Sequence, residues 1–195
     1  MAEVITKPKL LIHACCAPCS TVPLDRLSDD YDISFFFFGP NIHPYSEYNL
    51  RLEDQRKFCT KMGVHLIEGS YNKDTWDHAV LQYRDLPEGS MRCQSCFRMR
   101  MEETARVADE QAFDYFTVTM TVSRHKDSQV LNTIGQEVAG NFSAKYLAED
   151  FKKQDGYGLS VRKSNELGLR RQNYCGCFLS KQEAELRRMK REAKQ

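Results

Sequence analysis

Apolar residues occur along the first two-thirds of the chain in short runs that alternate with longer amphipathic stretches. The short runs have the length of buried strands and lie at Lys9–Ala14, Ile33–Phe38, Val64–Ile67 and Tyr115–Thr119. The stretches between and after them have helical spacing and lie at Val22–Leu27, Ser46–Met62, Asp74–Tyr83, Cys93–Ala108 and Asp127–Ala139. Strands that alternate with helices predict an α/β fold of three layers, α/β/α, with a mostly parallel sheet.

Two of the predicted helices carry informative local signals. Thr21 is a candidate N-cap of the first helix, with Pro23 in its first turn. The second helix places Leu52, Cys59 and Met62 on one stripe. Cys59, which has no other cysteine near it in the sequence, is therefore predicted to be a core residue without a chemical role.

The pattern weakens beyond Gly140 and becomes helical again in the basic segment Ser180–Gln195. A chain of 195 residues suits one domain, and no low-complexity segment or linker divides it. We therefore predict a single domain over residues 1–195. Its core spans about residues 9–140, and its C-terminal lobe, at about residues 141–195, ends in a helical extension.

The composition is that of an ordinary globular protein, with 41% apolar and 28% charged residues. No apolar run approaches the roughly 18 residues that a membrane helix needs. The first residues, MAEVITKPK, lack the basic-then-apolar order of a secretory signal. These observations predict a cytoplasmic protein without a membrane partner.

The net charge of +1 conceals an asymmetry along the chain. The segment from Arg162 to Gln195 contains ten Lys or Arg residues against four Glu residues. Such polarity indicates a surface that binds a polyanion. A solvated terminal helix, whose charges only keep the chain in solution, would give the same pattern, and charge alone leaves both interpretations open.

Eight cysteines need an explanation other than structural disulfides in a chain predicted to be cytoplasmic. Seven of them form three groups: Cys15, Cys16 and Cys19, then Cys93 and Cys96, then Cys175 and Cys177. The first group directly follows a predicted strand, where open parallel sheets bind ligands. The second lies at the start of a predicted helix, where the helix dipole favours thiolates.

Four thiolates from the first two groups match the ligands of a zinc ion or an iron–sulfur cluster. Zinc ligands usually stand two to four residues apart because both sulfur atoms must reach one ion, so adjacent cysteines are awkward ligands. Cys15 and Cys16 can instead bind different iron atoms of one cubane. A [4Fe-4S] cluster on Cys15, Cys16, Cys93 and Cys96 is therefore favoured. Zinc is the main alternative, and a disulfide between Cys15 and Cys16 is a weaker one.

Two further features of the cysteine groups stay open. Cys19 is a fifth thiol near the site, and it either ligates an additional metal, approaches a substrate or packs beneath the loop. A disulfide between Cys175 and Cys177 would span a single residue and be strained, which suits a redox-active pair. Two more metal ligands, or two inert thiols, are the alternatives.

The cysteine groups belong to longer blocks of sequence. These are LLIHACCAPC at Leu10–Cys19, PNIHPYSEYNLR at Pro40–Arg51, MRCQSCFRMRMEETA at Met91–Ala105, TVSRHKDSQVLNTIG at Thr121–Gly135 and LRRQNYCGCFLS at Leu169–Ser180. In content and order the blocks resemble the cobalamin-independent epoxyqueuosine reductases of the QueH family, and they cover most of the chain. One departure is FFFFGPNIHP, where a tyrosine–asparagine pair is expected before the proline; the cysteine motifs are unaffected.

The resemblance implies a nucleotide-hydrolase-like (HUP) fold and an oxidoreductase activity. That activity is iron–sulfur-dependent reduction of epoxyqueuosine to queuosine at the wobble position of tRNA, the last step of queuosine biosynthesis. The resemblance implies the same four cluster ligands, and a redox-active disulfide between Cys175 and Cys177. The implied partners are tRNA that carries epoxyqueuosine and a small electron-donor protein or reductant; a second iron or other metal stays open.

Removal of the epoxide oxygen takes two electrons and two protons, and a dithiol carries two electrons. Several polar residues near the motifs are candidates for positioning the substrate, including anticodon phosphates: Asn41, His43, Glu47, Arg51, Arg92, Arg124, Arg170 and Arg171. Helix caps, ion pairs and solvated surface are the alternatives for each. His13, which stands among strand residues, is predicted to be a core histidine.

Two other functions are compatible with the cysteine pattern. The first is an ATP-dependent, thiolation-type tRNA-modifying enzyme of the same fold. Such an enzyme is expected to have a glycine-rich phosphate loop after the first strand, but CCAPCST occupies that position here. The second is an RNA-binding module stapled by zinc, without catalysis.

Overall fold

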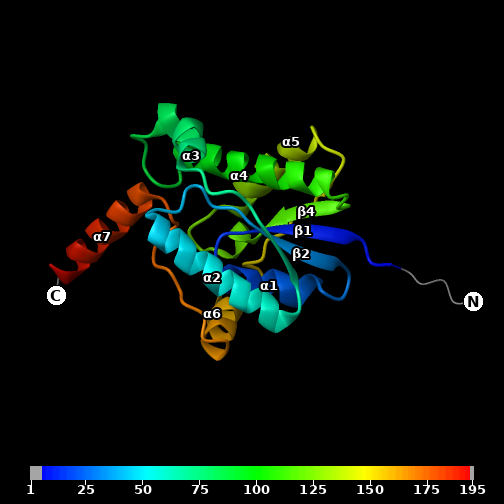
Figure 1. The fold of residues 1–195 in the computed structure, drawn as a ribbon. Coiled ribbons are helices and arrows are strands. Elements are labelled where there is room, and N and C mark those ends of the chain that lie inside the picture. Colours follow the sequence, from blue (N-terminus) through cyan, green and yellow to red (C-terminus); the bar gives the residue numbers. More distant parts are fainter. Residues whose placement is uncertain (1–5, 194–195) are drawn as a thin grey trace, which may run out of the picture.

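Five parallel strands form the central sheet of the computed structural model, which describes residues 6–193 (Figure 1). They are β1 (Lys9–Ala14), β2 (Asp32–Phe37), β3 (His65–Glu68), β4 (Tyr115–Val118) and β5 (Lys145–Tyr146). Their order across the sheet is β3-β2-β1-β4-β5, and every neighbouring pair is parallel. The predicted α/β fold with a parallel sheet is confirmed.

The central strand is β1, whose residues Leu10, Leu11 and Ile12 are fully buried. Leu10 pairs with Ile33 of β2 on one side and with Tyr115 of β4 on the other. A strand covered on both faces reads as the continuous apolar run seen in the sequence. Because the strand order reverses between β1 and β4, their carboxyl ends flank the crevice where such sheets bind ligands.

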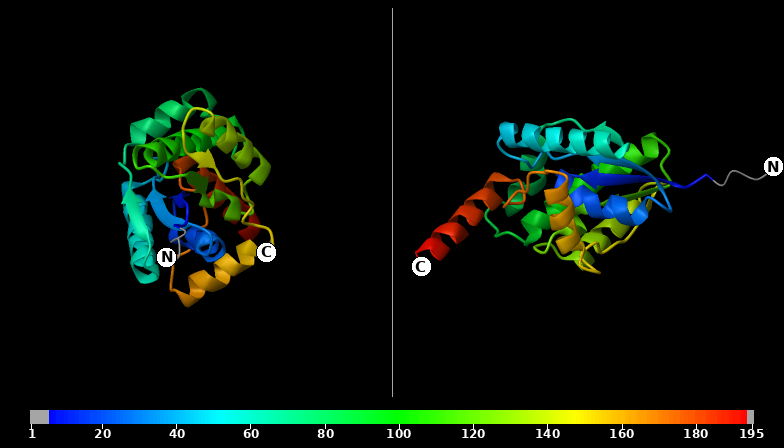
Figure 2. Two further views of the ribbon diagram at one scale, coloured as in Figure 1. Left: turned by 90° about the vertical axis from the view of Figure 1, so that its right-hand side faces the viewer. Right: turned by 90° about the horizontal axis from the view of Figure 1, so that it is seen from below.

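Helices cover both faces of the sheet (Figures 1 and 2). One face is covered by α1 (Ala17–Leu27), α2 (Tyr45–Met62) and α6 (Gly156–Glu166). The other is covered by α4 (Met91–Glu110) and α5 (Ser128–Ala139), and α3 (Lys73–Val80) packs against α4. The described residues also contain two short 3₁₀ turns, η1 at Leu81–Tyr83 and η2 at Thr119–Val122.

The last helix, α7 (Phe178–Glu192), projects away from the body beyond the carboxyl ends of the strands (Figures 1 and 2). Leu186 and Met189 on this helix are 56% and 57% exposed. Its predicted end at Gln195 lies outside the described residues, as do residues 1–5 of the segment used for the targeting prediction. No helix within residues 6–193 is long and apolar enough to cross a membrane.

The predicted start of the first helix was wrong. The helix begins at Ala17, so Thr21 is not its N-cap and Pro23 lies inside it. Cys16, in extended conformation, occupies the N-cap without a side-chain hydrogen bond, and Pro18 lies in the first turn, where a missing N–H costs nothing. The Thr21 hydroxyl donates to the carbonyl oxygen of Pro18 at 2.9 Å, so it bonds within the helix rather than capping it.

Two other details differ from the predicted pattern. Leu52 and Cys59 are buried as predicted, but Met62 at the end of the same stripe is 45% exposed because the helix ends there and Gly63 turns the chain away. The short strand β5 and the helix α6, both beyond Gly140, have no clear apolar period and were not predicted.

Candidate functional site

The first cysteine group leaves the carboxyl end of β1. Cys15 and Cys16 follow the strand directly, and both thiols are buried against Phe37 and Ile42. Cys19 lies in the first turn of α1 and is partly exposed. The central strand therefore delivers three thiols to the crevice between β1 and β4.

The second cysteine group lies in the first turns of α4. The Sγ of Cys93 accepts a hydrogen bond from the backbone N–H of Gly89 at 3.2 Å. Cys96 is buried and belongs to one apolar cluster with Trp76 and Cys177. The second and third cysteine groups, which are about eighty residues apart in the chain, therefore lie together.

The third group is a tight loop that ends at α7. Gly176 has φ +143°, and a Cβ at this position would lie 3.0 Å from Nδ2 of Asn41 and 3.1 Å from Ile42. Glycine is therefore required by both the backbone conformation and the close approach. Cys177 is the N-cap of α7, and its Sγ accepts a hydrogen bond from the N–H of Ser180 at 3.3 Å.

The segment after β2 holds this loop through polar contacts. The N–H of His43 donates to the carbonyl oxygen of Gly176 at 2.9 Å. Arg51, which is 1% exposed, donates from Nη1 to the carbonyl oxygen of Cys175 at 3.0 Å. The hydroxyl of Tyr174 donates back to the carbonyl oxygen of His43 at 3.1 Å. The cysteine loop is thus fixed from both of its ends.

Two arginines bind the carboxylate of Glu47. It accepts hydrogen bonds from Nε of Arg51 at 2.7 Å and from Nη1 of Arg170 at 3.2 Å, and Nε of Arg170 lies 3.5 Å from Asp54. Burial alone would raise the pKa of Glu47, but the two arginines outweigh it and lower the pKa. Three predicted positioning residues therefore contact one another behind the cysteine loop.

Two further predicted residues have polar atoms without partners. Asn41 is 1% exposed, and neither its Oδ1 nor its Nδ2 has a hydrogen-bond partner within residues 6–193. The ring of His43 lies against Trp76 and Phe178, with centroids 5.1 and 5.8 Å away, and its two nitrogens are also without partners there. Burial lowers the pKa of His43. Buried polar atoms of this kind are expected to meet a bound group.

The charges of the cysteine groups act on two cations, Arg100 and Lys126. Burial alone would lower the pKa of the fully buried Arg100, but Cys15, Cys96 and Cys175, as thiolates, raise it. Lys126 is half-buried in the loop after η2. Burial alone would lower its pKa, but Cys175 and Cys15, as thiolates, raise it. Nη1 and Nη2 of Arg100 have no hydrogen-bond partner in the described part of the chain.

Most of these thiols hold their protons while no metal is bound. Burial raises the pKa of Cys96 to about 12 and also raises that of Cys93. A hydrogen bond with Cys15 lowers the pKa of Cys16, but Cys19 and burial raise it to about 12. The hydrogen bond with Cys16 in turn lowers the pKa of Cys19. A metal that binds here must displace protons from the thiols.

The donor set suits an iron–sulfur cluster. All eight cysteines lie within the described residues as free thiols, and no three His, Cys, Asp or Glu side chains there converge around a single ion. A cubane has a different requirement, because each of its four ligands binds a separate iron. The buried guanidinium of Arg100, whose Nη1 and Nη2 have no hydrogen-bond partner within residues 6–193, supplies positive charge where thiolate ligands would otherwise be buried without compensation. Cys15, Cys16, Cys93 and Cys96 therefore fit such a group chemically.

The remaining predicted positioning residues lie in three places. Nη2 of Arg92 donates to Glu183 of α7 at 2.9 Å, which ties α4 to α7. Nη1 of Arg171 donates to the carbonyl oxygen of Ser160 in α6 at 3.3 Å. Arg124 is exposed, and its guanidinium carbon lies 3.7 Å from the ring centre of Tyr157.

Two residues of the site region were missed from the sequence: Arg100 and Tyr157. Arg100 follows Cys96 by four residues, so helical spacing alone places the two side chains on one face of α4. Tyr157 had no such signal, because the chain turn that positions it depends on tertiary contacts. His13, by contrast, is the predicted core histidine and is fully buried.

Comparison with known proteins gives consistent results over most of the chain. The family described as "Epoxyqueuosine reductase QueH" matches residues 10–183. The epoxyqueuosine reductase QueH of Staphylococcus epidermidis is 40% identical over 182 residues, which cover 89% of this chain and 76% of the relative. The protein of the same name from Thermotoga maritima is 36% identical over 174 residues, covering 88% and 89%.

Solved structures with a similar fold include the U34-tRNA thiolase NcsA from Methanococcus maripaludis, determined with its [4Fe-4S] cluster. It has a TM-score of 0.57 and 16% identity, and the alignment covers 92% of this chain and 64% of the thiolase. A predicted subunit of a tRNA methyltransferase from Methanocaldococcus jannaschii has a TM-score of 0.54, 12% identity and coverage of 80% and 74%. At these identities the similarity shows the fold alone.

Proposed function

Because this chain belongs to the epoxyqueuosine reductase QueH family and converts epoxyqueuosine to queuosine in tRNA, we propose that it does so with a [4Fe-4S] cluster. The ligands are Cys15, Cys16, Cys93 and Cys96, from the end of β1 and the start of α4. Family membership sets aside the thiolation-type enzyme and the non-catalytic zinc module.

One observation carries the cluster proposal: the position of Arg100. This cation is fully buried, and the terminal nitrogens of its guanidinium have no hydrogen-bond partner within residues 6–193. A buried, unpaired charge is costly, and its neighbours here are the cysteine thiols of all three groups. Thiolates that ligate a cluster would be anions in contact range of this cation, and their presence would offset that cost.

The cluster, when bound, supplies single-electron chemistry and iron as a Lewis acid toward the epoxide oxygen. The reaction balances with the dithiol of Cys175 and Cys177. The epoxide takes up two electrons and two protons, both C–O bonds of the oxygen break, and alkene and water are released. Oxidation of the two thiols to a disulfide supplies both electrons and both protons.

The geometry of the third cysteine loop supports this redox role. Cys177 lies at the N-terminus of α7; burial raises the pKa of its thiol, and the hydrogen bond from the Ser180 N–H to its sulfur works against that effect and favours the thiolate. A thiolate is the form that attacks and leaves in dithiol–disulfide exchange. We assign regeneration of the dithiol to a small protein or small-molecule reductant of the dithiol class.

The segment after β2 acts on this loop. Asn41, His43, Glu47 and Arg51 are positioning residues in the proposal, because their contacts fix the carbonyl groups of the loop and pack against Gly176. The unpartnered amide of Asn41 and ring of His43 remain available to the bound nucleoside. Cys19, the partly exposed thiol of the first group, is the candidate ligand for an additional iron or other metal.

The substrate is tRNA that carries epoxyqueuosine at the wobble position, and we place the reaction in the cytoplasm, where tRNA is modified. The test is anaerobic incubation of the purified protein with such tRNA and a dithiol reductant, followed by nucleoside analysis. Iron and acid-labile sulfide are measured on the same sample. Queuosine formation by a protein that holds zinc but no iron would overturn the cluster proposal and leave the reductase activity intact.

A further inference from the structure

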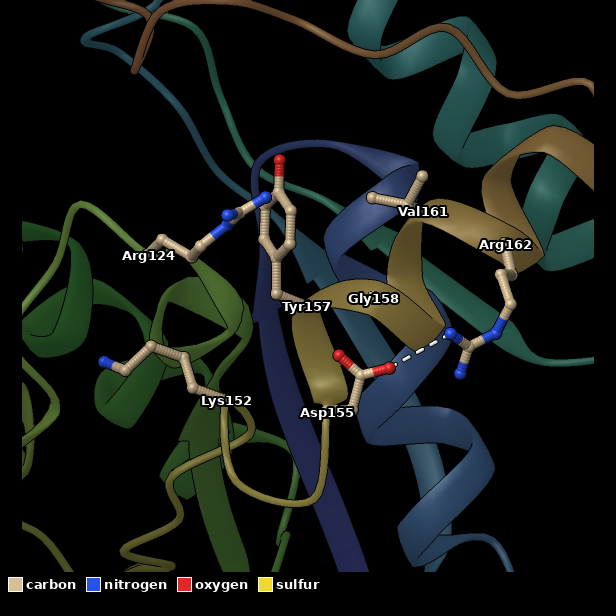
Figure 3. Close-up of a pocket in the computed structure, with 7 residues that line it drawn as sticks. All are labelled: Arg124, Lys152, Asp155, Tyr157, Gly158, Val161 and Arg162. Carbon is tan, nitrogen blue, oxygen red and sulfur yellow. Dashed lines mark hydrogen bonds and ion pairs between the residues drawn. The ribbon is translucent and has the colours of Figure 1, made fainter.

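A hollow of about 510 Å³ opens on the surface beside the loop that carries Lys126 (Figure 3). Arg124 and Lys152 line one side, and Tyr157 and Val161 of α6 line the other. Its volume falls within the range of sites that hold small ligands, about 300–1,000 Å³. The function described so far leaves this hollow unexplained.

The hollow contains a flat platform of the kind on which nucleobases stack. The guanidinium carbon of Arg124 lies 3.7 Å from the ring centre of Tyr157, so the two planar groups overlap (Figure 3). Arginine and aromatic side chains are the common stacking surfaces for unpaired bases in RNA-binding proteins. Arg171 lies 5.4 Å from the centre of the same ring and is itself fixed by bonds to Ser160 and Ser164.

The charges around the platform suit a phosphate. Arg162, at the far rim, is paired with Asp155 at 3.0 Å. Arg124 forms no ion pair within residues 6–193. The amino group of Lys152 donates to the backbone carbonyl oxygen of Lys126 at 2.7 Å. Lys152 also forms a long ion pair with Asp150, at 3.9 Å, which neutralises part of its charge. Arg124 is thus the main cation available to an anion next to the platform, and Lys152 is a weaker second one.

The platform is fixed relative to the cysteine centre by two short connections. Arg124 and Lys126 belong to the same loop after η2, and Lys126 lies close enough to Cys175 and Cys15 for their charges to act on it. On the other side, the hydroxyl of Ser160 in α6 donates at 2.7 Å to the carbonyl oxygen of Pro18, which lies in the first turn of α1 between Cys16 and Cys19. A strand of RNA whose reactive base enters the centre would pass this platform with a neighbouring nucleotide.

We propose that the hollow binds one unpaired nucleotide adjacent to epoxyqueuosine in the anticodon loop. Its base stacks on the platform of Arg124 and Tyr157, and its phosphate contacts Arg124 and Lys152. This rests on tRNA being the substrate and assigns a site for it. The anticodon loop is single-stranded, so its bases are free to stack on protein side chains, and an open hollow suits one residue of a polymer.

The experiment measures anaerobic binding of a synthetic anticodon stem-loop RNA, with guanosine at the wobble position, to the iron-loaded full chain across a salt series. Tyr157→Ala should weaken binding about 5- to 150-fold, the range for loss of one base stack, without changing the salt dependence. Tyr157→Phe keeps the ring and should bind like the parent. Arg124→Gln should weaken binding and lower the slope of log affinity against log salt by about 0.7, as expected for one single-strand phosphate.

The matched control is Arg106→Gln. Arg106 is an exposed arginine at the other end of α4, paired with Glu103 and Glu110, so the variant loses the same charge far from the platform. It should bind RNA like the parent. Iron content and melting temperature of every variant confirm an intact fold.

Unchanged RNA affinity in Tyr157→Ala, with normal iron and melting temperature, would overturn the proposal. Equal losses in Arg124→Gln and Arg106→Gln would also overturn it, because the effect would then be a non-specific charge effect. Neither result would touch the reductase activity itself, which is measured separately on the parent protein with epoxyqueuosine-containing tRNA.

Discussion

Nε of Arg100 lies 3.2 Å from Nε2 of His13, and both side chains are fully buried at the end of the central strand. The same ring nitrogen lies 2.8 Å from the carbonyl oxygen of Phe38 and can serve only one of the two at a time. Burial and the charge of Arg100 hold the pKa of His13 well below its ordinary value, so the ring is neutral and able to accept. The contact aims the rest of the guanidinium away from His13.

This relationship predicts that Arg100 sets the redox potential of the cluster. Arg100→Met removes the charge and keeps the length of the side chain. The reduced cluster is more negative than the oxidised one, so loss of a nearby cation disfavours reduction. The equilibrium constant for reduction should fall at least tenfold, which lowers the midpoint potential by about 59 mV. Redox titration followed by electron paramagnetic resonance measures this, and Arg100→Lys, which keeps the charge, should lie between the two.

A purely structural role of Arg100 makes a different prediction. In cluster-depleted protein, replacement of a buried, unpaired charge by an apolar side chain is expected to be neutral or stabilising. The melting temperature of depleted Arg100→Met should therefore not fall below that of the depleted parent. A lower melting temperature together with an unchanged midpoint potential would show that the arginine only supports the fold.

The sheet was predictable because its strands are buried on both faces. Lys9–Ala14 was located at its observed bounds, and Ile33–Phe38 within one residue, since parallel strands covered by helices consist of continuous apolar residues. The helix α6 was missed for a related reason. Its attachment consists of hydroxyl contacts such as Ser160 to Pro18 rather than an apolar stripe, and two glycines stand in its first turn.

The cysteine groups were predictable as motifs, but their electrostatic surroundings were not. Arginines in an amphipathic helix are expected to face solvent, yet Arg51 and Arg100 are buried. Each has a partner in a distant segment, the carbonyl oxygen of Cys175 for Arg51 and the ring of His13 for Arg100, although Arg51 also bonds Glu47 in its own helix. Such pairings depend on the tertiary fold, and no local period reveals them.

The cluster ligands are tested by removal of one thiol. Cys93→Ala should lose most of its iron and sulfide, because a cubane with a missing ligand is poorly held. Cys59→Ala is the matched control: Cys59 is a core residue of α2, and burial raises its pKa to about 11, so it remains a neutral thiol. Full iron content in Cys93→Ala, measured beside an unchanged Cys59→Ala, would refute the ligand assignment.

The tight packing of Gly176 predicts a measurable cost for a side chain there. Gly176→Ala places a Cβ at φ +143° and 3.0 Å from Asn41, so unfolding free energy should fall by about 1–3 kcal/mol. Gly140→Ala, at φ −59°, brings a Cβ to 3.3 Å from the backbone oxygen of Glu137, so its unfolding free energy should change by no more than about 1 kcal/mol. Denaturant titration gives both values, and equal stability of the two variants would mean that the loop relaxes freely.

The basic helix α7 predicts a salt-dependent contribution to tRNA affinity. Replacement of Arg187, Arg188, Lys190 and Arg191 by Gln should weaken binding of whole tRNA and flatten its salt dependence, by about 0.9 in slope for each lost duplex phosphate contact. A control of equal charge replaces exposed cations elsewhere: Lys57, Lys61, Arg106 and Lys145. If tRNA affinity and its salt dependence fall equally in both variants, α7 contributes only net charge and does not form a specific tRNA-binding surface.

The last prediction concerns Cys177, which we expect to cycle between thiol and disulfide with Cys175. Cys177→Ser is a conservative test because serine is a preferred N-cap residue, and α7 begins at this position with a bond from the Ser180 N–H. The variant should fold normally and keep its iron, because the cluster ligands lie elsewhere. It should still reduce epoxyqueuosine with a chemical one-electron donor that bypasses the dithiol, yet fail at multiple turnover with a dithiol reductant. Full multiple turnover in this variant would exclude the relay. Loss of iron would instead show that Cys177 is a metal ligand, and the two electrons would then have to come from another group.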